Sequence, residues 1–386
     1  MKIVGIIAEF NPFHNGHKYL IKKAKEITNA DIAICIISGN FTQLGNISII
    51  DKFKRAKIAI ENGADAIIEL PTIYATASSQ YFAFGAVNIL NSLNCIDYLC
   101  FGSETANIEE LKSIANKLIA NEKEIWKIIQ EELRNGISFA SARQNAISDF
   151  LNTDELAISS LSNNILAIEY IKSLIKLKSN ITPIAIKRKE QENITSATSI
   201  RQMLYEDNNY VYNYLPYKKI YFDKAMFNDN FYKIVQYNII SRGKEYIKNI
   251  NEVTEGLENK IYNAINVSAN YEEFIHNIKS KRYQLSKIKR ILIYILLDIS
   301  KEDFLELNNN SNIYIHLLAI NNNIKNSLLS LINKKAKCKI FTSINDKLLN
   351  SQSEIVKKSL LLDIKATNIY SILSDQNINK DYTNKL

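Results

Sequence analysis

The sequence has 386 residues, of which 46% are hydrophobic and 23% are charged, and its formal net charge is +8. At ~100–200 residues per domain, this length predicts two or three domains, each with a hydrophobic core. The composition excludes a disordered chain, and the 10 Gly and 4 Pro exclude collagen-like and linker-type sequences.

The sequence also bears on cellular setting. No apolar run approaches the ~20 residues that a membrane-spanning helix needs, and the N-terminal segment lacks a secretory cleavage pattern. The four Cys form no CxxC pair, so neither a disulfide framework nor a zinc site is expected. We expect a cytoplasmic protein without membrane association or protein-held metal, and no protein partner is inferred.

Charge is distributed unevenly along the chain. Residues 1–200 hold 21 basic and 21 acidic side chains, whereas residues 201–386 hold 27 and 19, which accounts for the net +8. A neutral first half and a basic second half favour a ligand-binding or catalytic domain joined to one that binds a polyanion. A solvated basic surface without a partner is the alternative.

The hydrophobic pattern alternates strands and helices in the first half. Apolar, β-branched runs predict strands at 2–8, 31–38, 64–70, 95–101 and 181–186, and amphipathic segments predict helices at 17–28, 51–62 and 78–93. This pattern predicts an α/β fold with a doubly wound, parallel, five-stranded sheet. No strand pattern is evident after about residue 210, so residues 211–386 are expected to form an all-α domain.

The strongest chemical signal lies between the first strand and its helix. His14, Gly16 and His17 form a His-x-Gly-His motif where a doubly wound sheet binds nucleotides. The helix N-terminus presents unpaired N–H groups to phosphates, Gly16 allows close approach, and the imidazoles can donate hydrogen bonds to phosphate oxygens. The alternative is a pair of structural histidines that cap the helix.

The segment 5–20 resembles the His-x-Gly-His nucleotidylyltransferase superfamily. Residues 196–201, Ser-Ala-Thr-Ser-Ile-Arg, resemble the late motif of that superfamily, which grips the β and γ phosphates at a helix start. Ser196, Thr198 and Arg201 are therefore expected to contact the triphosphate.

Further segments resemble one family, the bacterial tRNA(Met) cytidine acetate ligases. They are residues 8–17, 38–43, 62–71, 101–104, 162–170 and 186–188, in that order. The resemblance implies an enzyme that activates acetate with ATP and transfers the acetyl group to the exocyclic amine of the wobble cytidine of elongator tRNA(Met), giving N-acetylcytidine. It also implies an ATP-binding catalytic domain at 1–210 and a basic, tRNA-binding helical domain at 211–386.

The resemblance assigns site residues too. His14 and His17 become the catalytic phosphate ligands, Gly102, Asn163 and Arg188 become ATP contacts, and Mg²⁺ is expected on the phosphates. The alternatives are that Gly102 only makes a turn, Asn163 caps a helix and Arg188 is a surface residue. The ATP-binding loop comprises Ile7, Ala8, Glu9, Phe10, Asn11, Pro12, Phe13, His14, Asn15, Gly16, His17, Lys18, Tyr19 and Leu20.

The chain departs from the family pattern in three places. Leu44 and Asn46 stand where the family usually has Arg and Glu, and His316 stands where the family tends to have Arg. A Trp is also common at the position of Phe53. These departures concern tRNA contacts and acetate positioning rather than the ATP site.

A basic segment in the second half is the candidate RNA contact. Residues 278–290 contain no acidic side chain, and Tyr283 lies among the basic ones. Basic side chains with an interleaved aromatic are typical of a phosphate-binding face, and a solvated helix surface is the alternative. The candidate RNA contacts are Lys281, Arg282, Lys287, Lys289 and Arg290.

Two other functions remain open from the sequence. A nucleotidylyltransferase acting on a small phosphorylated metabolite would share the ATP site without needing the basic second half. A non-catalytic tRNA-binding module would keep the nucleotide fold without using its histidines.

Overall fold

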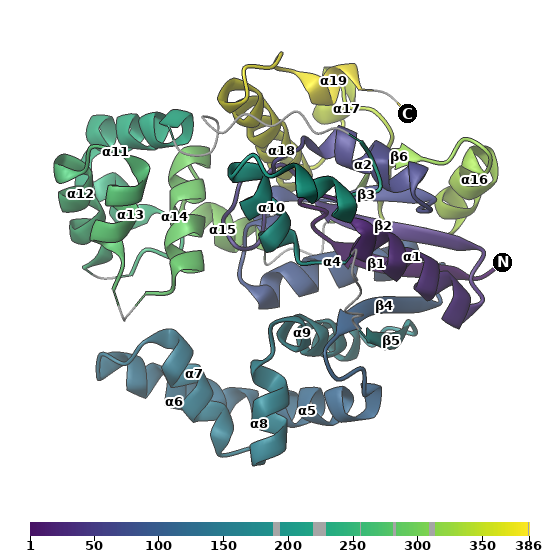
Figure 1. Cartoon of the computed structure of the whole chain (residues 1–386), viewed down its shortest axis with the longest axis horizontal. Helices are drawn as coiled ribbons and strands as arrows, with labels where there is room; N and C mark the ends of the chain where they lie inside the picture. Colours follow the sequence, from purple (N-terminus) through teal and green to yellow (C-terminus); the bar gives the residue numbers. More distant parts are fainter. Residues whose placement is uncertain (188–193, 219–228, 255, 281–282, 309–312, 385) are drawn as a thin grey trace.

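The computed structural model describes residues 1–187, 194–218, 229–254, 256–280, 283–308, 313–384 and 386. Its described residues form one mixed sheet with helices on both faces (Figure 1). The strands are β1 (Ile3–Ala8), β2 (Ile32–Ser38), β3 (Ala66–Leu70), β4 (Tyr98–Ser103), β5 (Thr182–Lys187), β6 (Tyr314–Ile320) and β7 (Lys339–Phe341).

The topology of the sheet confirms the predicted doubly wound arrangement. The strand order is β5-β4-β1-β2-β3-β6-β7, and β1 to β5 are mutually parallel. The strand order reverses at β1, which pairs with β2 on one side and β4 on the other. In such sheets the ligand crevice lies at this switch point, outside the carboxyl ends of the strands.

Both faces of the sheet are buried. Because successive side chains of a strand point to opposite faces, β1 contributes Val4 and Ile6 to one core and Ile3 to the other. The first core lies under α1 (Asn15–Thr28) and α2 (Lys52–Glu61), and the second under α4 (Ser79–Leu93) and α9 (Ser162–Lys176). Asp51 caps α2 by accepting the Lys54 N–H at 3.0 Å.

Helices also extend the fold beyond the sheet. A helical insertion precedes β5, and a second group of helices follows α10 (Figure 1). The insertion comprises α5 (Ile108–Ala120), α6 (Glu122–Arg134), α7 (Phe139–Ser148) and α8 (Thr153–Ser160). The short helix α3 (Thr72–Ala75) lies between β3 and α4. The helical elements between β5 and β6 are α10 (Ala197–Tyr205), the 3₁₀ helix η1 (Asn209–Tyr214), α11 (Asp229–Asn249), α12 (Leu257–Val267), α13 (Tyr271–Ile278), α14 (Leu285–Leu297) and α15 (Lys301–Asn308).

Within the described residues, the prediction of five strands is corrected to seven, and the prediction of an all-α second half is wrong because two of the strands lie there. β6 pairs antiparallel with β3, and β7 pairs parallel with β6, so the C-terminal part returns to the sheet. The run 314–320 is short and almost wholly buried, and periodicity alone does not distinguish such a strand from a buried helix. The remaining helices are α16 (Lys325–Lys335), α17 (Asp346–Asn350), α18 (Glu354–Leu373) and α19 (Lys380–Thr383).

The division at residue 210 stays a prediction, although β6 and β7 place part of the second half beside β3. In the described part of the chain, none of the helices combines the length and the apolar character needed to cross a bilayer.

Candidate functional site

The two histidines of the motif are held against each other at the start of α1. His14 is the N-cap residue, and its Nδ1 accepts the Gly16 N–H at 3.0 Å, while the His14 N–H is donated to Nδ1 of His17 at 3.3 Å. The ring centroids lie 3.8 Å apart. Because Nδ1 accepts in both rings, the neutral imidazoles carry their protons on Nε2. The alternative of a helix-capping histidine is therefore correct for His14. The capping hydrogen bonds use Nδ1 of both rings, and Nε2 of each ring remains the donor.

Buried aromatic rings fix the loop that carries these histidines. Phe10 and Phe13 are fully buried and pack edge-on at 4.8 Å, and the Phe10 ring lies 4.9 Å from that of His17. A Cβ at Gly16 would lie 2.7 Å from Cε1 of His14. Glycine is therefore required at this position because any side chain would displace the imidazole.

The N-terminus of α10 meets the same loop. Ser196 caps α10 by accepting the Ser199 N–H at 3.0 Å. Arg201 donates from Nη1 to the carbonyl oxygen of Asn11 at 2.7 Å and from Nη2 to Oγ1 of Thr198 at 3.0 Å. The structure thus brings together two motifs that lie about 180 residues apart in the sequence, with a guanidinium and helix N–H groups beside the histidines.

The switch point holds a second group of predicted residues. Gly102 lies in β4, opposite Ile186 of β5. Asn163 lies in the first turn of α9, whose N-cap is Leu161, so the alternative of Asn163 as the cap is wrong. Its side-chain amide donates to Oε1 of Glu104 at 2.7 Å.

Glu104 was not assigned a role from the sequence, although it belongs to the quoted segment 101–104. Its carboxylate also accepts the backbone N–H groups of Asn163 and Asn164, each at 3.0 Å. A carboxylate on helix N–H groups is favourable because it meets the positive end of the helix dipole. Glu104 therefore anchors the start of α9 and orients the Asn163 side chain.

Arg55 and Glu9 connect the loops after β1 and β2. Arg55 is fully buried and donates to the carbonyl oxygens of Glu9, Ser38, Gly39 and Ile50. The Glu9 carboxylate accepts the Gln43 N–H at 2.9 Å, and burial raises the pKa of this carboxyl group. A lysine has no planar fork to replace these donors, which explains an arginine here in a chain where lysine greatly outnumbers arginine.

The predicted RNA contacts divide into different environments. Lys287 lies 5.4 Å from the ring centroid of Tyr283, and Lys289 donates to Oδ1 of Asn46 at 3.0 Å. Arg290 is buried and pairs with both carboxylate oxygens of Glu252, at 2.9 and 2.7 Å, so the structure does not support it as an RNA contact. Lys281, Arg282 and the predicted ATP contact Arg188 lie outside the described residues.

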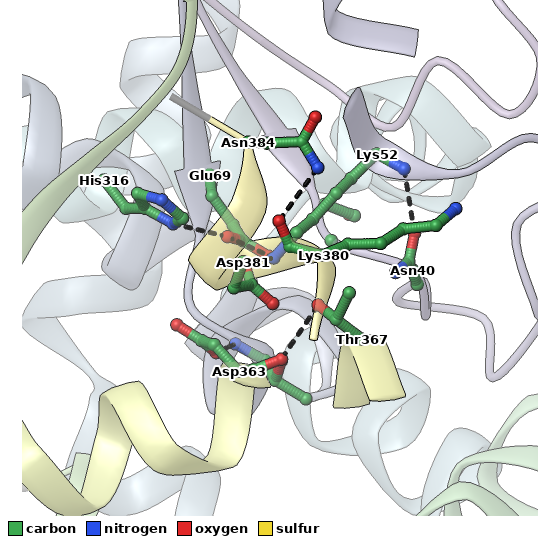
Figure 2. A network of polar contacts seen from close by, with 12 residues as sticks. Asn40, Lys52, Glu69, His316, Asp363, Thr367, Lys380, Asp381 and Asn384 are labelled. Atoms are coloured by element: carbon green, nitrogen blue, oxygen red, sulfur yellow. Dashed lines mark hydrogen bonds and ion pairs between the residues drawn. The ribbon is translucent and has the colours of Figure 1, made fainter. Parts of the chain in front are cut away.

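A buried charge cluster lies behind the loop after β2 (Figure 2). The Lys52 ammonium is 2.7 Å from both Glu69 and Asp381, and its backbone N–H is donated to Asn40. His316 contacts Glu69 at 2.8 Å through the β3–β6 register. His316, which stands where the family tends to have Arg, is therefore a member of this charge cluster.

This cluster has the composition of a metal site. Among the described residues, Glu69, His316 and Asp381 form one group with suitably spaced ligand atoms. However, the Lys52 ammonium already lies between the carboxylates and supplies the positive charge there. We therefore interpret the cluster as structural.

The comparisons with known proteins cover nearly the whole chain. The HIGH Nucleotidyl Transferase family model matches residues 1–385. A tRNA(Met) cytidine acetate ligase of Clostridium perfringens is 39% identical, over 99% of this chain and 98% of the relative, and one of Clostridium botulinum is 40% identical, over 99% and 97%. The crystal structure of Thermotoga maritima TmcAL bound with alpha-thio ATP matches with a TM-score of 0.91 at 32% identity, over 100% of this chain and 99% of that one.

Proposed function

Because this chain belongs to the tRNA(Met) cytidine acetate ligase family, we propose that it acetylates the wobble cytidine of elongator tRNA(Met) with acetate and ATP. In the first step, acetate and ATP give acetyl-adenylate and pyrophosphate. In the second step, the cytidine amine attacks the acetyl carbonyl, a C–N bond forms, and AMP and a proton leave. The reaction takes place in the cytoplasm.

The observation that carries this proposal is the shared loop of the two phosphate motifs. His14 and His17 carry Nε2 protons at the start of α1, and Arg201 of α10 binds the same loop at Asn11. Donors fixed before the reaction stabilise the charge that develops on the phosphates as pyrophosphate leaves.

The other contacts follow from this placement. We propose that Gly102 and Asn163 receive the adenosine part of ATP at the switch point, that Ser196 and Thr198 contribute the N-terminus of α10, and that Arg188 completes the ATP site. Lys287 and Lys289 are the proposed RNA contacts among the described residues, in the basic segment of residues 211–386.

We propose magnesium here as a phosphate-bound ion. The histidines and helix N–H groups are donors and offer no oxygen ligands, so the ion would be held mainly by phosphate oxygens and water, and the Ser196 and Thr198 hydroxyls are the side-chain oxygens at the start of α10. When bound, it neutralises phosphate charge. The protein residues named above orient the triphosphate and hold the protons on Nε2.

The test separates catalysis from helix capping. Labelled acetate, ATP and tRNA are incubated with the wild-type protein, with His14→Ala and with His14→Asn. Asparagine is a good N-cap residue, so His14→Asn keeps the cap but loses the imidazole, whereas His14→Ala loses both. We expect acetylation to fall by roughly 10²–10³-fold in both variants, as for other lost transition-state donors, while only His14→Ala loses about 1 kcal/mol of stability.

Three results would contradict the proposal. Full acetylation by His14→Asn would make the histidines helix caps only. Label that enters tRNA from acetyl-CoA without ATP would exclude the acetate ligase reaction. Pyrophosphate release that depends on a phosphorylated metabolite and ignores tRNA would instead identify a nucleotidylyltransferase.

A further inference from the structure

A cavity of about 410 Å³ lies on the β2 side of the phosphate-binding loop. The loop 44–49, α10 and the helices α11, α13 and α14 line it. Its volume lies within the roughly 300–1,000 Å³ typical of small-molecule sites. Leu44 and Leu285 line it and are 45% and 40% exposed, so it opens to solvent.

The cavity is distinct from the proposed ATP contacts at the switch point. Gly102 and Asn163 do not line it, and neither do the two histidines. Thr198 and Arg201, two of the proposed triphosphate contacts, do line it, and the Arg201 guanidinium also binds the carbonyl oxygen of Asn11 in the phosphate-binding loop. A ligand in this cavity would therefore lie next to the triphosphate end of the ATP site and not in place of the adenosine part.

Aromatic side chains line the cavity from three helices. Tyr205 comes from α10, Phe231 from α11 and Tyr271 from α13, and the rings of Phe231 and Tyr271 meet edge-on at 5.8 Å. Aromatic side chains stack on unpaired bases, which is how proteins commonly bind single-stranded RNA. Acetate has no aromatic ring and is too small to stack on these side chains.

Positively charged side chains also line the cavity. Lys289 donates to the neutral amide of Asn46, and burial together with the charge of Arg201 lowers the pKa of Lys289. An anionic group bound between Lys289 and Arg201 would stabilise the protonated form of Lys289. Leu44 and Asn46, where the chain departs from the family pattern, line the same cavity.

We infer that this cavity receives the acceptor cytidine nucleotide of an unpaired RNA loop, with the base against the aromatic side chains and the phosphate near Lys289. The inference rests on the proposed function, since the amine of this cytidine is the nucleophile of the proposed second step. Extruding a base from a loop is less costly than from a duplex, and the cavity supplies stacking in return.

The test measures RNA and ATP binding separately. A fluorescent anticodon stem-loop of elongator tRNA(Met) is titrated with the wild-type protein, with Leu285→Trp, which narrows the opening, and with Tyr271→Leu, which removes an aromatic side chain. We expect the Kd for the stem-loop to rise roughly tenfold in both variants, while the Kd for ATP stays unchanged. Leu361→Trp is the matched control, since Leu361 on α18 is 44% exposed and does not line the cavity.

The outcomes separate this inference from the proposed function. Unchanged stem-loop binding in both variants would overturn the cavity assignment, and so would an equal loss of ATP affinity, because the cavity would then belong to ATP. If the wild-type protein binds RNA through the cavity but transfers no acetyl group, the proposed function fails and the cavity assignment stands.

Discussion

Replacing Lys52 by methionine should destabilise the protein strongly. The Lys52 side chain is fully buried, and its ammonium is 2.7 Å from Glu69 and 2.7 Å from Asp381. Figure 2 shows that these groups come from α2, β3 and the C-terminal α19. Methionine has a similar length but no charge, so the substitution removes the cation with little change in volume.

The magnitude follows from the two carboxylates that would be left behind. Unit charges at 4 Å interact by ~4 kcal/mol at an effective dielectric constant of 20, and the cost of burying the charges offsets much of this. Measurements on other buried pairs put the loss of one partner at about 3–5 kcal/mol. Burial by itself raises the pKa of Glu69, but Lys52 and His316 hold it at about 2. The variant keeps the burial of Glu69 but loses the stabilising charge of Lys52, so we expect a loss of about 3–5 kcal/mol at neutral pH.

Urea unfolding followed by circular dichroism measures this loss. Lys54→Met on the same helix is the matched control, because that side chain is 65% exposed and its pairing with Asp51 is worth only about 0–1 kcal/mol. The deficit of Lys52→Met should shrink on acidification, because the two carboxylates can then take up protons. A loss below about 1 kcal/mol would refute the reasoning, since it would show that the carboxylates need no buried cation.

Two further predictions concern Asp363 and Glu104. Burial and the charge of Glu69 raise the pKa of Asp363 from 3.8 to about 7, so this group's contribution to stability is complete below pH 3.8 and is lost as the pH rises towards 7. Asp363→Asn should therefore reduce the change in unfolding free energy between pH 3.8 and 7, by up to about 4 kcal/mol. If the unfolding free energy of the variant depends on pH as that of the wild type does, the prediction is wrong. Glu104→Ala removes the acceptor that orients Asn163 and should raise the Kd for ATP about tenfold in calorimetric titration. Unchanged ATP affinity would show that ATP binding does not depend on the orientation that Glu104 gives to Asn163.

The parallel core of the fold was predictable because its signals are local. Each of the first five strands is an apolar run followed by a helix, and several of these helices begin with a recognisable cap, such as Asp51 before α2. The position of the histidines at the end of β1 follows from the same pattern, because parallel strands present their carboxyl ends at one edge.

The edge of the sheet was not predictable in this way. The run 314–320 pairs with β3 across about 250 residues of intervening sequence, and its own pattern does not specify a partner. Its pairing creates the contact between His316 and Glu69, and the C-terminal Asp381 then completes the charge cluster around Lys52.

The sequence by itself determined the parallel core of the fold, the His-x-Gly-His motif and the family, because these depend on residue types at short, fixed spacings. Only the tertiary structure decided which side chains are left to bind a ligand. It committed Arg290 to Glu252, placed Glu104 behind Asn163, and joined Arg201 and Lys289 in one cavity. The reason is physical: a side chain's partners are set by packing between segments that are distant in the chain, and a local pattern carries no information about that packing.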